Sequence, residues 1–340
     1  MRYSKPIPLV SILVCHHKGD LIYDFVKSVQ KSLDITFEIF VATSDDNIAI
    51  NGIPGCYTFN CYDGPAEKRN KMARMAKGKY LAIFDDDVEV SETCIAEMIK
   101  TIESRDDIGM VYGKLYKYGA GKHFDEAGGY LTSTGFIWSR AGQNILDTGQ
   151  YDNECSIFAG KSASCLVKAE VWHKCWGMDE DFWILGEESD LSWRMWLFGY
   201  RVYWCPKSVA YHKFNTPLKP ANDYYTSKRV HFNGCRNYIT MLIKNLETRN
   251  LWKILPLHIS IWIGASLAMI FTGKVTQGLN ILRGIGYTLW KVGFLLEKRR
   301  LIQLKRVRTD DELFAYVFCR APRGYYTQRF TRYFMIGLHG

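Results

Sequence analysis

Short apolar segments alternate with helical segments over the first 85 residues, and this alternation restricts the fold more than any other feature of the sequence. Residues 10–15, 37–43 and 79–85 are apolar and rich in strand-forming residues, as expected for strands buried on both faces. Residues 21–32 and 64–78 lie between them and have helical patterning. The β-α-β-α-β order predicts an α/β fold with a mostly parallel, doubly wound sheet.

Three consecutive aspartates, Asp85, Asp86 and Asp87, follow the third predicted strand, at the kind of strand end where such sheets bind ligands. Carboxylate oxygens suit Mg²⁺ or Mn²⁺, and a bound cation would cancel their mutual repulsion and could neutralise a diphosphate. Two simpler interpretations stay open: a solvated turn, or a capping role for Asp85 at a helix that begins near Ser91. No GxGxxG or GxxxxGK[ST] motif supports a dinucleotide-binding or P-loop fold.

A second group of acids, Glu187, Glu188 and Asp190, opens a predicted helix that ends at Gly199. Acids at a helix N-terminus suit the helix dipole, so capping alone could explain them. One of the three could instead be a general base. His212 follows the next predicted strand; a lone histidine is more often structural, but an acidic metal site nearby makes it a candidate ligand.

Composition limits the class of protein. The chain has 340 residues, of which 47% are hydrophobic and 23% charged, as in folded globular proteins. Its ten cysteines form no CxxC pair and no zinc-ligand spacing, so we expect reduced thiols in a cytosolic protein. The first 20 residues contain one short apolar run, which is too short for a signal peptide and is expected to be the first strand.

The last third of the chain has a different pattern. Residues 254–272 contain no fully charged residue, and their length is close to the ~20 residues that span a bilayer. Residues 276–296 are amphipathic, with a polar stripe formed by Thr276, Asn280, Arg283, Tyr287 and Lys291, and residues 297–308 are strongly basic. We therefore divide the chain into a catalytic domain, 1–215, and a C-terminal helical region, 216–340, with membrane-associating helices at about 251–296 and a basic tail.

Three interpretations of this region stay open. We favour interfacial helices on an anionic leaflet over a membrane-spanning hairpin and over helices packed on a soluble partner or a twin subunit. The basic run at 297–308 could also be a plain solvated face. The net charge of +9 is concentrated in this region beside apolar helices and no nucleic-acid-binding motif accompanies it, so we exclude nucleic acid as a partner.

Taken in order, these motifs resemble those of the family-2 glycosyltransferases with a GT-A fold. The resemblance covers roughly residues 8–215 and rests on VSILVCHHKGD, FEIFVATSDD, GPAEKRNKMARMAKGKYLAIFDDDVEV, AGGYLTSTGFIW, WGMDEDFWILGEESDLSWRMWLFGYRVYW and VAYHKF. It implies inverting transfer of a sugar from a nucleotide-diphosphate donor, with Mn²⁺ or Mg²⁺ as cofactor. The C-terminal part is similar, more loosely, to transferases that assemble lipid-linked glycans, of the rhamnosyl or galactofuranosyl type.

The resemblance assigns the donor side of the site. Asp85-Asp86-Asp87 resembles the DXD motif, so Asp85 and Asp87 are the expected metal ligands, with His212 completing the set. Asp86 is expected near the ribose, and Arg69, in the family's helix beside the nucleotide, is expected at the base or ribose.

The resemblance also assigns the acceptor side. Glu187-Glu188-x-Asp190-Leu191 resembles the family's acidic segment, whose second acid is the usual catalytic base, here Glu188. Glu187, Asp190 and Asp179 are the expected acceptor contacts. The family usually has Glu-Asp where this chain has Glu-Glu, so Glu187 or Asp190 stays an alternative base.

Two strand ends depart from the family pattern. Relatives often carry Pro-x-Tyr-Asn after the first strand, where this chain has Cys15-His16-His17-Lys18, and an Asp after the second strand, where it has Thr43. His16 and Asp45 are taken as candidate contacts of the donor nucleotide, with a UDP- or dTDP-sugar favoured. The QxxRW element of processive synthases is missing, which favours addition of one or a few sugars.

Two functions of different class follow. The first is a transferase acting on a lipid-linked acceptor at the cytoplasmic face of the membrane, peripheral rather than spanning, as a monomer or a homo-oligomer. The second is a catalytically silent relative that serves as a binding or scaffold subunit. Within the first class, a soluble transferase acting on protein or a small molecule is a weaker alternative.

Overall fold

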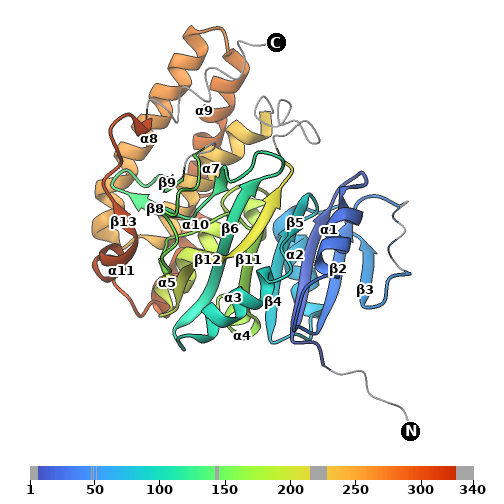
Figure 1. The fold of residues 1–340 in the computed structure, drawn as a ribbon. Coiled ribbons are helices and arrows are strands. Elements are labelled where there is room, and N and C mark those ends of the chain that lie inside the picture. Colours follow the sequence, from blue (N-terminus) through green and yellow to red (C-terminus); the bar gives the residue numbers. More distant parts are fainter. Residues whose placement is uncertain are drawn as a thin grey trace.

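A ten-stranded sheet forms the centre of the molecule (Figure 1). The computed structural model describes residues 7–46, 48, 50, 52–141, 145–214 and 228–326. The strands of the sheet are β1 Val10–His16, β2 Phe37–Thr43, β3 Cys56–Asn60, β4 Tyr80–Asp85, β5 Val88–Val90, β6 Ile108–Lys117, β7 Phe124–Glu126, β10 Cys155–Ser156, β11 Ser164–Lys168 and β12 Arg201–His212. A separate three-stranded sheet contains β8 Gly129–Thr132, β9 Ile137–Ser139 and β13 Phe318–Cys319.

The strand order explains why polar strand ends gather at one edge. The order is β10-β12-β6-β11-β4-β1-β2-β3, with β5 on β12 and β7 on β6. The strands β3, β2, β1 and β4 are mutually parallel, as predicted, and β11 is inserted antiparallel between β4 and β6. In register, Cys15 of β1 lies opposite Asp85, and His16 lies opposite Thr43. The carboxyl ends of β1, β2 and β4 therefore meet at one edge.

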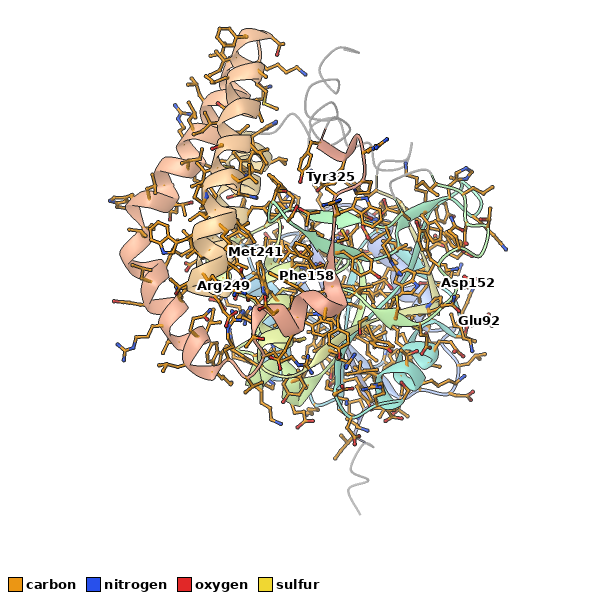
Figure 2. The ribbon with its side chains drawn as sticks, turned by 90° about the vertical axis from the view of Figure 1, so that its left-hand side faces the viewer. Glu92, Asp152, Phe158, Met241, Arg249 and Tyr325 are labelled. Carbon is orange, nitrogen blue, oxygen red and sulfur yellow. The ribbon has the colours of Figure 1, made fainter. Side chains whose placement is uncertain are left out.

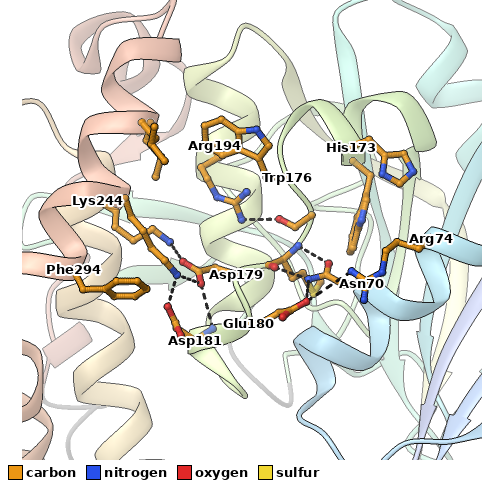
Figure 3. Close-up of a pocket in the computed structure, with 16 residues that line it drawn as sticks. Asn70, Arg74, His173, Trp176, Asp179, Glu180, Asp181, Arg194, Lys244 and Phe294 are labelled. Atoms are coloured by element: carbon orange, nitrogen blue, oxygen red, sulfur yellow. Dashed lines mark hydrogen bonds and ion pairs between the residues drawn. The ribbon is translucent and has the colours of Figure 1, made fainter. Parts of the chain in front are cut away.

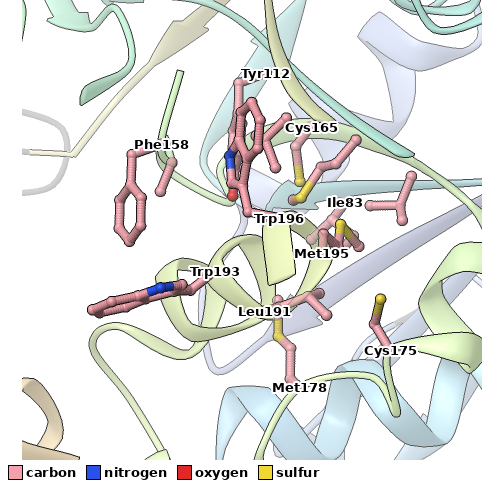
Figure 4. Close-up of a cluster of buried hydrophobic side chains, with 14 of the residues drawn as sticks. Ile83, Tyr112, Phe158, Cys165, Cys175, Met178, Leu191, Trp193, Met195 and Trp196 are labelled. Atoms are coloured by element: carbon pink, nitrogen blue, oxygen red, sulfur yellow. The ribbon is translucent and has the colours of Figure 1, made fainter. Parts of the chain in front are cut away.

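Helices cover both faces of this sheet. Helices α1 Leu21–Val29 and α3 Cys94–Glu103 pack on one face, where alternate residues of β1 such as Ile12 and Val14 point. Helices α2 Pro65–Met75, α4 Ala169–Lys174 and α5 Glu187–Leu197 contribute to the core on the other face, together with Leu13. Figure 4 shows part of this second core, in which Trp193, Met195 and Trp196 of α5 meet Tyr112 and Phe158. Both faces of β1 are buried, as its uniform apolarity predicts.

The alternatives for the aspartate run are decided by local structure. Helix α3 begins after Thr93, which is its N-cap, so Asp85 does not cap it. Asp86 and Asp87 are 8% and 2% exposed, which excludes a solvated turn. The second acidic group does open α5 at Glu187, and Gly199, with φ of 95°, follows its end as predicted.

The C-terminal region consists of helices that return to the sheet domain. They are α7 Lys228–Asn245, α8 Thr248–Phe271, α9 Val275–Trp290, α10 Val292–Lys305 and α11 Asp310–Val317. After them, β13 pairs with β8, so the chain re-enters the first domain. The predicted boundary at 215/216 lies outside the described residues. A third core, shared by the two regions, places Phe136 against Tyr238 and Trp262.

The structure changes two details of the C-terminal region. Residues 276–296 cover parts of two helices, because α9 ends at Trp290 and α10 starts at Val292, and Asn280 of the predicted polar stripe is buried. The basic run is neither a tail nor a plain solvated face. It lies mainly in α10, where Arg299 donates to the carbonyl of Ile243 at 2.6 Å.

Among the residues that the structure describes, α8 is the one helix long and apolar enough to cross a membrane. About a third of its most apolar window is buried against the rest of the protein. In Figures 1 and 2, α8 and α9 extend together beyond the sheet.

Candidate active site

The predicted metal ligands come together at the carboxyl edge of the sheet. Asp85 ends β4, and the turn after it carries Asp87. His212 ends β12, which pairs with β5 so that His212 lies opposite Val88. One ligand atom from each of Asp85, Asp87 and His212 lies within 4.8 Å of the others. Two carboxylates and an imidazole at this spacing fit a divalent cation such as Mn²⁺.

His212 is held by a carboxylate that the sequence analysis did not identify. Its Nδ1 lies 2.8 Å from Oδ2 of Asp125, and its Nε2 lies 3.3 Å from Oδ1 of Asp87. Lys161 donates to the same oxygen of Asp125 at 2.6 Å. The bond to Asp125 fixes the ring so that Nε2 faces the aspartates, which is how proteins commonly orient a metal-binding histidine.

The protonation of this pair follows from its surroundings. Burial by itself would lower the pKa of His212, but the hydrogen bonds that its ring donates to Asp125 and Asp87 raise it to about 9. Burial would likewise raise the pKa of Asp125, yet Lys161 and His212 together hold it below its ordinary value. The pair is therefore an ion pair near neutral pH in the protein without metal.

Asp86 and Asp85, at the same edge of the sheet, each have a basic partner. Asp86 accepts from Nδ1 of His16 at 2.7 Å, and His16 is almost fully buried at the end of β1. Arg69 of α2 is buried as well, and its guanidinium joins Asp85, at 2.9 Å, to Glu187, at 3.0 Å. Sequence reasoning placed Arg69 at the nucleotide, whereas its observed contacts join the DXD-like turn to the start of α5.

Glu188 lines a cavity of about 200 Å³. Burial, followed by the neighbouring Glu187, raises the pKa of Glu188 well above its ordinary value. Burial also raises the pKa of Glu187, although Arg69 opposes that effect. Three residues that sequence reasoning missed line the same cavity: Glu126, Lys161 and Tyr238. No local motif marks them, because they come from three separate segments.

Asp190 and Asp179 form a separate buried ionic network. Asp190 is fully buried and is bonded to Arg194 at 2.9 Å, to Lys244 at 3.0 Å and to the amide of Asn245. It lines neither the Glu188 cavity nor a larger cavity of about 610 Å³ whose walls include Asp179 and Glu180. The structure thus separates Asp190 from Glu188.

The larger cavity contains Asp179 (Figure 3). Asp179 is ion-paired to Lys244 and, at 2.6 Å, to Lys298 of α10. The remaining walls of this cavity combine apolar side chains such as Trp176 and Phe294 with charged side chains. Asp179 therefore joins the sheet domain to the C-terminal helices.

Asp45 lies just after β2, at the same edge of the sheet as the aspartates. Its backbone N–H donates to Oγ1 of Thr43 at 2.9 Å. The neighbouring Asp46 accepts from the amide of Asn60 and from the hydroxyl of Tyr62. This position suits a contact with a ligand that extends from the predicted metal ligands along the strand ends.

Comparison with known proteins identifies relatives of this site. Residues 11–203, more than half of the chain, match the family model described as glycosyl transferase family 2. No curated protein sequence matches this chain.

Solved structures share its fold. The structure of GalNAc-T7 with UDP, GalNAc and Mn²⁺ superposes with a TM-score of 0.56 and 14% sequence identity. The match covers 85% of this chain and 58% of the GalNAc-T7 chain. The S. aureus TarS fragment 1–349 in complex with UDP-GlcNAc superposes with a TM-score of 0.56 and 14% sequence identity. The match covers 89% of this chain and 88% of the TarS fragment. At these identities the likeness concerns the fold alone.

The contact between Asp125 and His212 generates the first prediction. The Asp125→Asn variant removes the charge that orients His212, so we expect Mn²⁺ affinity to fall about 10–100-fold. Calorimetric titration with Mn²⁺ measures this change. Asp106→Asn, at an exposed aspartate in the turn before β6, is the matched control, and equal affinities in the two variants would contradict the assigned role.

Proposed function

Because the chain belongs to glycosyl transferase family 2 and has the GT-A fold, we propose that it transfers a sugar from a nucleotide-diphosphate donor to a hydroxyl group of an acceptor. One observation carries this proposal: the Asp85–Asp87–His212 group and the Glu188 cavity are connected through Lys161 and Asp125. A site for a diphosphate and a candidate base are thus part of one polar network.

The donor side is assigned as follows. Asp85, Asp87 and His212 would hold Mn²⁺ or Mg²⁺, which neutralises the diphosphate of the donor and of the leaving nucleotide when it is bound. We assign ribose recognition to Asp86, which His16 holds in place, and a contact with the nucleobase to Asp45. We assign Arg69 to holding Asp85 beside Glu187. A UDP- or dTDP-sugar is the favoured donor, since the GalNAc-T7 structure contains UDP and the TarS structure contains UDP-GlcNAc.

Glu188 is the proposed catalytic base. In its deprotonated form, its carboxylate accepts the proton of the acceptor hydroxyl as that oxygen attacks the anomeric carbon. The bond between the anomeric carbon and the diphosphate oxygen breaks with its electron pair, and the nucleotide diphosphate leaves. A single displacement inverts the anomeric centre. Glu187, which is paired with Arg69, places a negative charge beside Glu188. This charge favours the protonated form of Glu188 and so makes its carboxylate a stronger base.

We further propose a lipid-linked glycan as the acceptor and a peripheral location on the cytoplasmic face of the membrane. The support is an apolar surface, which we call the outer helix face. It consists of exposed side chains of α8, α9 and α10: Trp252, Leu257, Ile263, Leu267, Phe271, Leu279, Leu282, Leu289, Trp290, Leu296 and Leu304.

Several features of the outer helix face fit a leaflet surface better than water. Phe271 and Trp290 are 85% and 74% exposed, which is unusual for such large apolar side chains on a water-facing helix. Cationic residues, among them Lys253, Arg283 and Arg300, are exposed on the same helices. Apolar side chains together with cations are what binds an amphipathic helix to anionic lipid.

The donor assignment can be tested by calorimetry. UDP, dTDP and GDP are titrated with and without Mn²⁺, and we expect one of them to bind only when the metal is present. The Asp87→Ala variant should lose this metal-dependent binding. If no nucleotide binds with metal present, the silent scaffold subunit becomes the better interpretation of the chain.

The base assignment has a separate test. Glu188→Gln keeps the shape of the side chain but cannot accept a proton, so we expect turnover to fall by about 10²-fold or more with nucleotide affinity unchanged. Since the pKa of Glu188 is raised, the wild-type rate should rise with pH through that pKa as Glu188 loses its proton, and Glu188→Gln should lack this rise. An active Glu188→Gln with an inactive Glu187→Gln would assign the base to Glu187.

Lipid binding can be measured by vesicle flotation. The triple variant Phe271→Ser, Leu289→Ser, Trp290→Ser removes three large exposed side chains, and we expect its partition to vesicles of phosphatidylcholine and phosphatidylglycerol to fall at least about tenfold. Ile145→Ser, at an exposed apolar residue far along the chain from these helices, is the control. Unchanged flotation of the triple variant, or a wild type that stays in solution as a dimer, would contradict a lipid-facing surface.

A further inference from the structure

The segment that leads into the two glutamates has an unusual backbone. Residues 183–186 connect the short 3₁₀ helix Glu180–Phe182 to α5. Trp183, Leu185 and Gly186 all have positive φ, at 56°, 74° and 87°. Only glycine adopts this conformation freely, so surrounding groups must hold Trp183 and Leu185 in it. The first residue after this segment is Glu187, so its conformation sets where α5 begins and where Glu188 points.

One amide of the C-terminal region holds this segment. Asn237 of α7 is 2% exposed, and its Nδ2 lies 3.1 Å from the carbonyl oxygen of Phe182, 2.9 Å from that of Ile184 and 2.7 Å from that of Leu185. A side-chain amide has two N–H groups, so it shares them among the three carbonyls. These carbonyl oxygens thereby find donors inside the protein, where an unpaired one would be costly.

The residues on either side of Asn237 reinforce this contact. The guanidinium of Arg236 donates to the carbonyl of Asp181 at 2.6 Å and to that of Phe182 at 3.0 Å. Tyr238 lines the Glu188 cavity. Three consecutive residues of α7 therefore fix the segment and form part of the wall that the acceptor would meet.

The opposite side of the segment is closed by α2. The indole of Trp183 lies against Gly64, the N-cap of α2, so closely that a β-carbon built there would be 1.8 Å from Cδ1 of Trp183. The guanidinium of Arg229 lies 4.8 Å from the centre of the same indole. The segment is thus held between α2 and α7.

We propose that Asn237 is a positioning residue for the transfer reaction: it holds residues 182–185 so that Glu188 faces the acceptor cavity. The catalytic consequence rests on the proposed function, whereas the structural consequence does not. Asn237 lies about fifty residues beyond the acids that it positions, in the helical region next to the outer helix face. That region is therefore part of the active site and not only an anchor.

Two substitutions of Asn237 separate loss of donors from loss of volume. Asn237→Asp keeps the size of the side chain and replaces the N–H donors by oxygens that repel the three carbonyls. Asn237→Ala removes both. We expect amide hydrogen exchange in residues 183–188 to rise at least about tenfold in both variants, with UDP affinity in the presence of Mn²⁺ unchanged. Exchange needs no turnover, so this readout is independent of the proposed function.

Turnover supplies the second readout. We expect kcat to fall about 10–100-fold in both variants with KM for the donor unchanged, because a displaced base slows the chemical step without weakening the nucleotide site. Asn250→Ala is the matched control. Asn250 is also a buried asparagine, and its side-chain amide donates at 2.9 Å to Asp310, which does not belong to this segment. It should lower thermal stability comparably and leave exchange in 183–188 and kcat unchanged.

Gly64→Ala tests the segment from the other side. The φ of Gly64 is −69°, which alanine adopts freely, so the substitution acts only by displacing Trp183. We expect it to reproduce the faster exchange and the lower kcat. The proposal is overturned if both Asn237 variants match Asn250→Ala in exchange and in kcat, or if they lose UDP binding in parallel with kcat.

Discussion

Repulsion among carboxylates is the constraint on which the site depends. Asp85, Asp86 and Asp87 are adjacent in the chain, and two unit charges about 4 Å apart interact with roughly 4 kcal/mol at the effective dielectric constant near a protein surface. Each of them has a different cationic or potentially cationic partner, contributed by a different element: Arg69 from α2, His16 from β1 and His212 from β12. The parallel register of β1 and β4 and the pairing of β12 with β5 are what bring these partners within reach.

A second set of charges joins the sheet domain to the helices that follow it. Lys244 of α7 is 1% exposed and contacts both Asp179 and Asp190. Removing one member of such a buried group leaves an uncompensated charge, which typically destabilises a protein by about 3–5 kcal/mol. The helices therefore cannot detach from the acidic segment without a large cost. Lys298 of α10 contacts Asp179 as well, and α10 carries part of the outer helix face, so this apolar surface is joined to the segment that precedes the proposed base.

Much of the site could be predicted from sequence because local patterns specify it. The strands at 10–15, 37–43 and 79–85 were predicted correctly, since buried parallel strands leave an uninterrupted apolar signal. The structure also brings together Asp85, Asp87 and His212 as proposed metal ligands. Within the polar stripe of 276–296, Asn280 is buried although Thr276 and Arg283 are exposed. Helical spacing shows that Asn280 shares a face with other polar residues, but not that it lies at the edge of the face that packs on neighbouring helices.

The sequence by itself determined the α/β class, the strand end that carries the aspartates and the helix that begins with Glu187. These features depend on residues close together in the chain, whose periodicity and charge can be recognised without partners. Only the tertiary structure decided which side chains hold them. Asp125 reaches His212 across 87 positions, and Asn237 reaches Leu185 across 52. Such contacts leave no periodic signal, because a single buried aspartate or asparagine resembles any other until the fold sets two distant segments side by side.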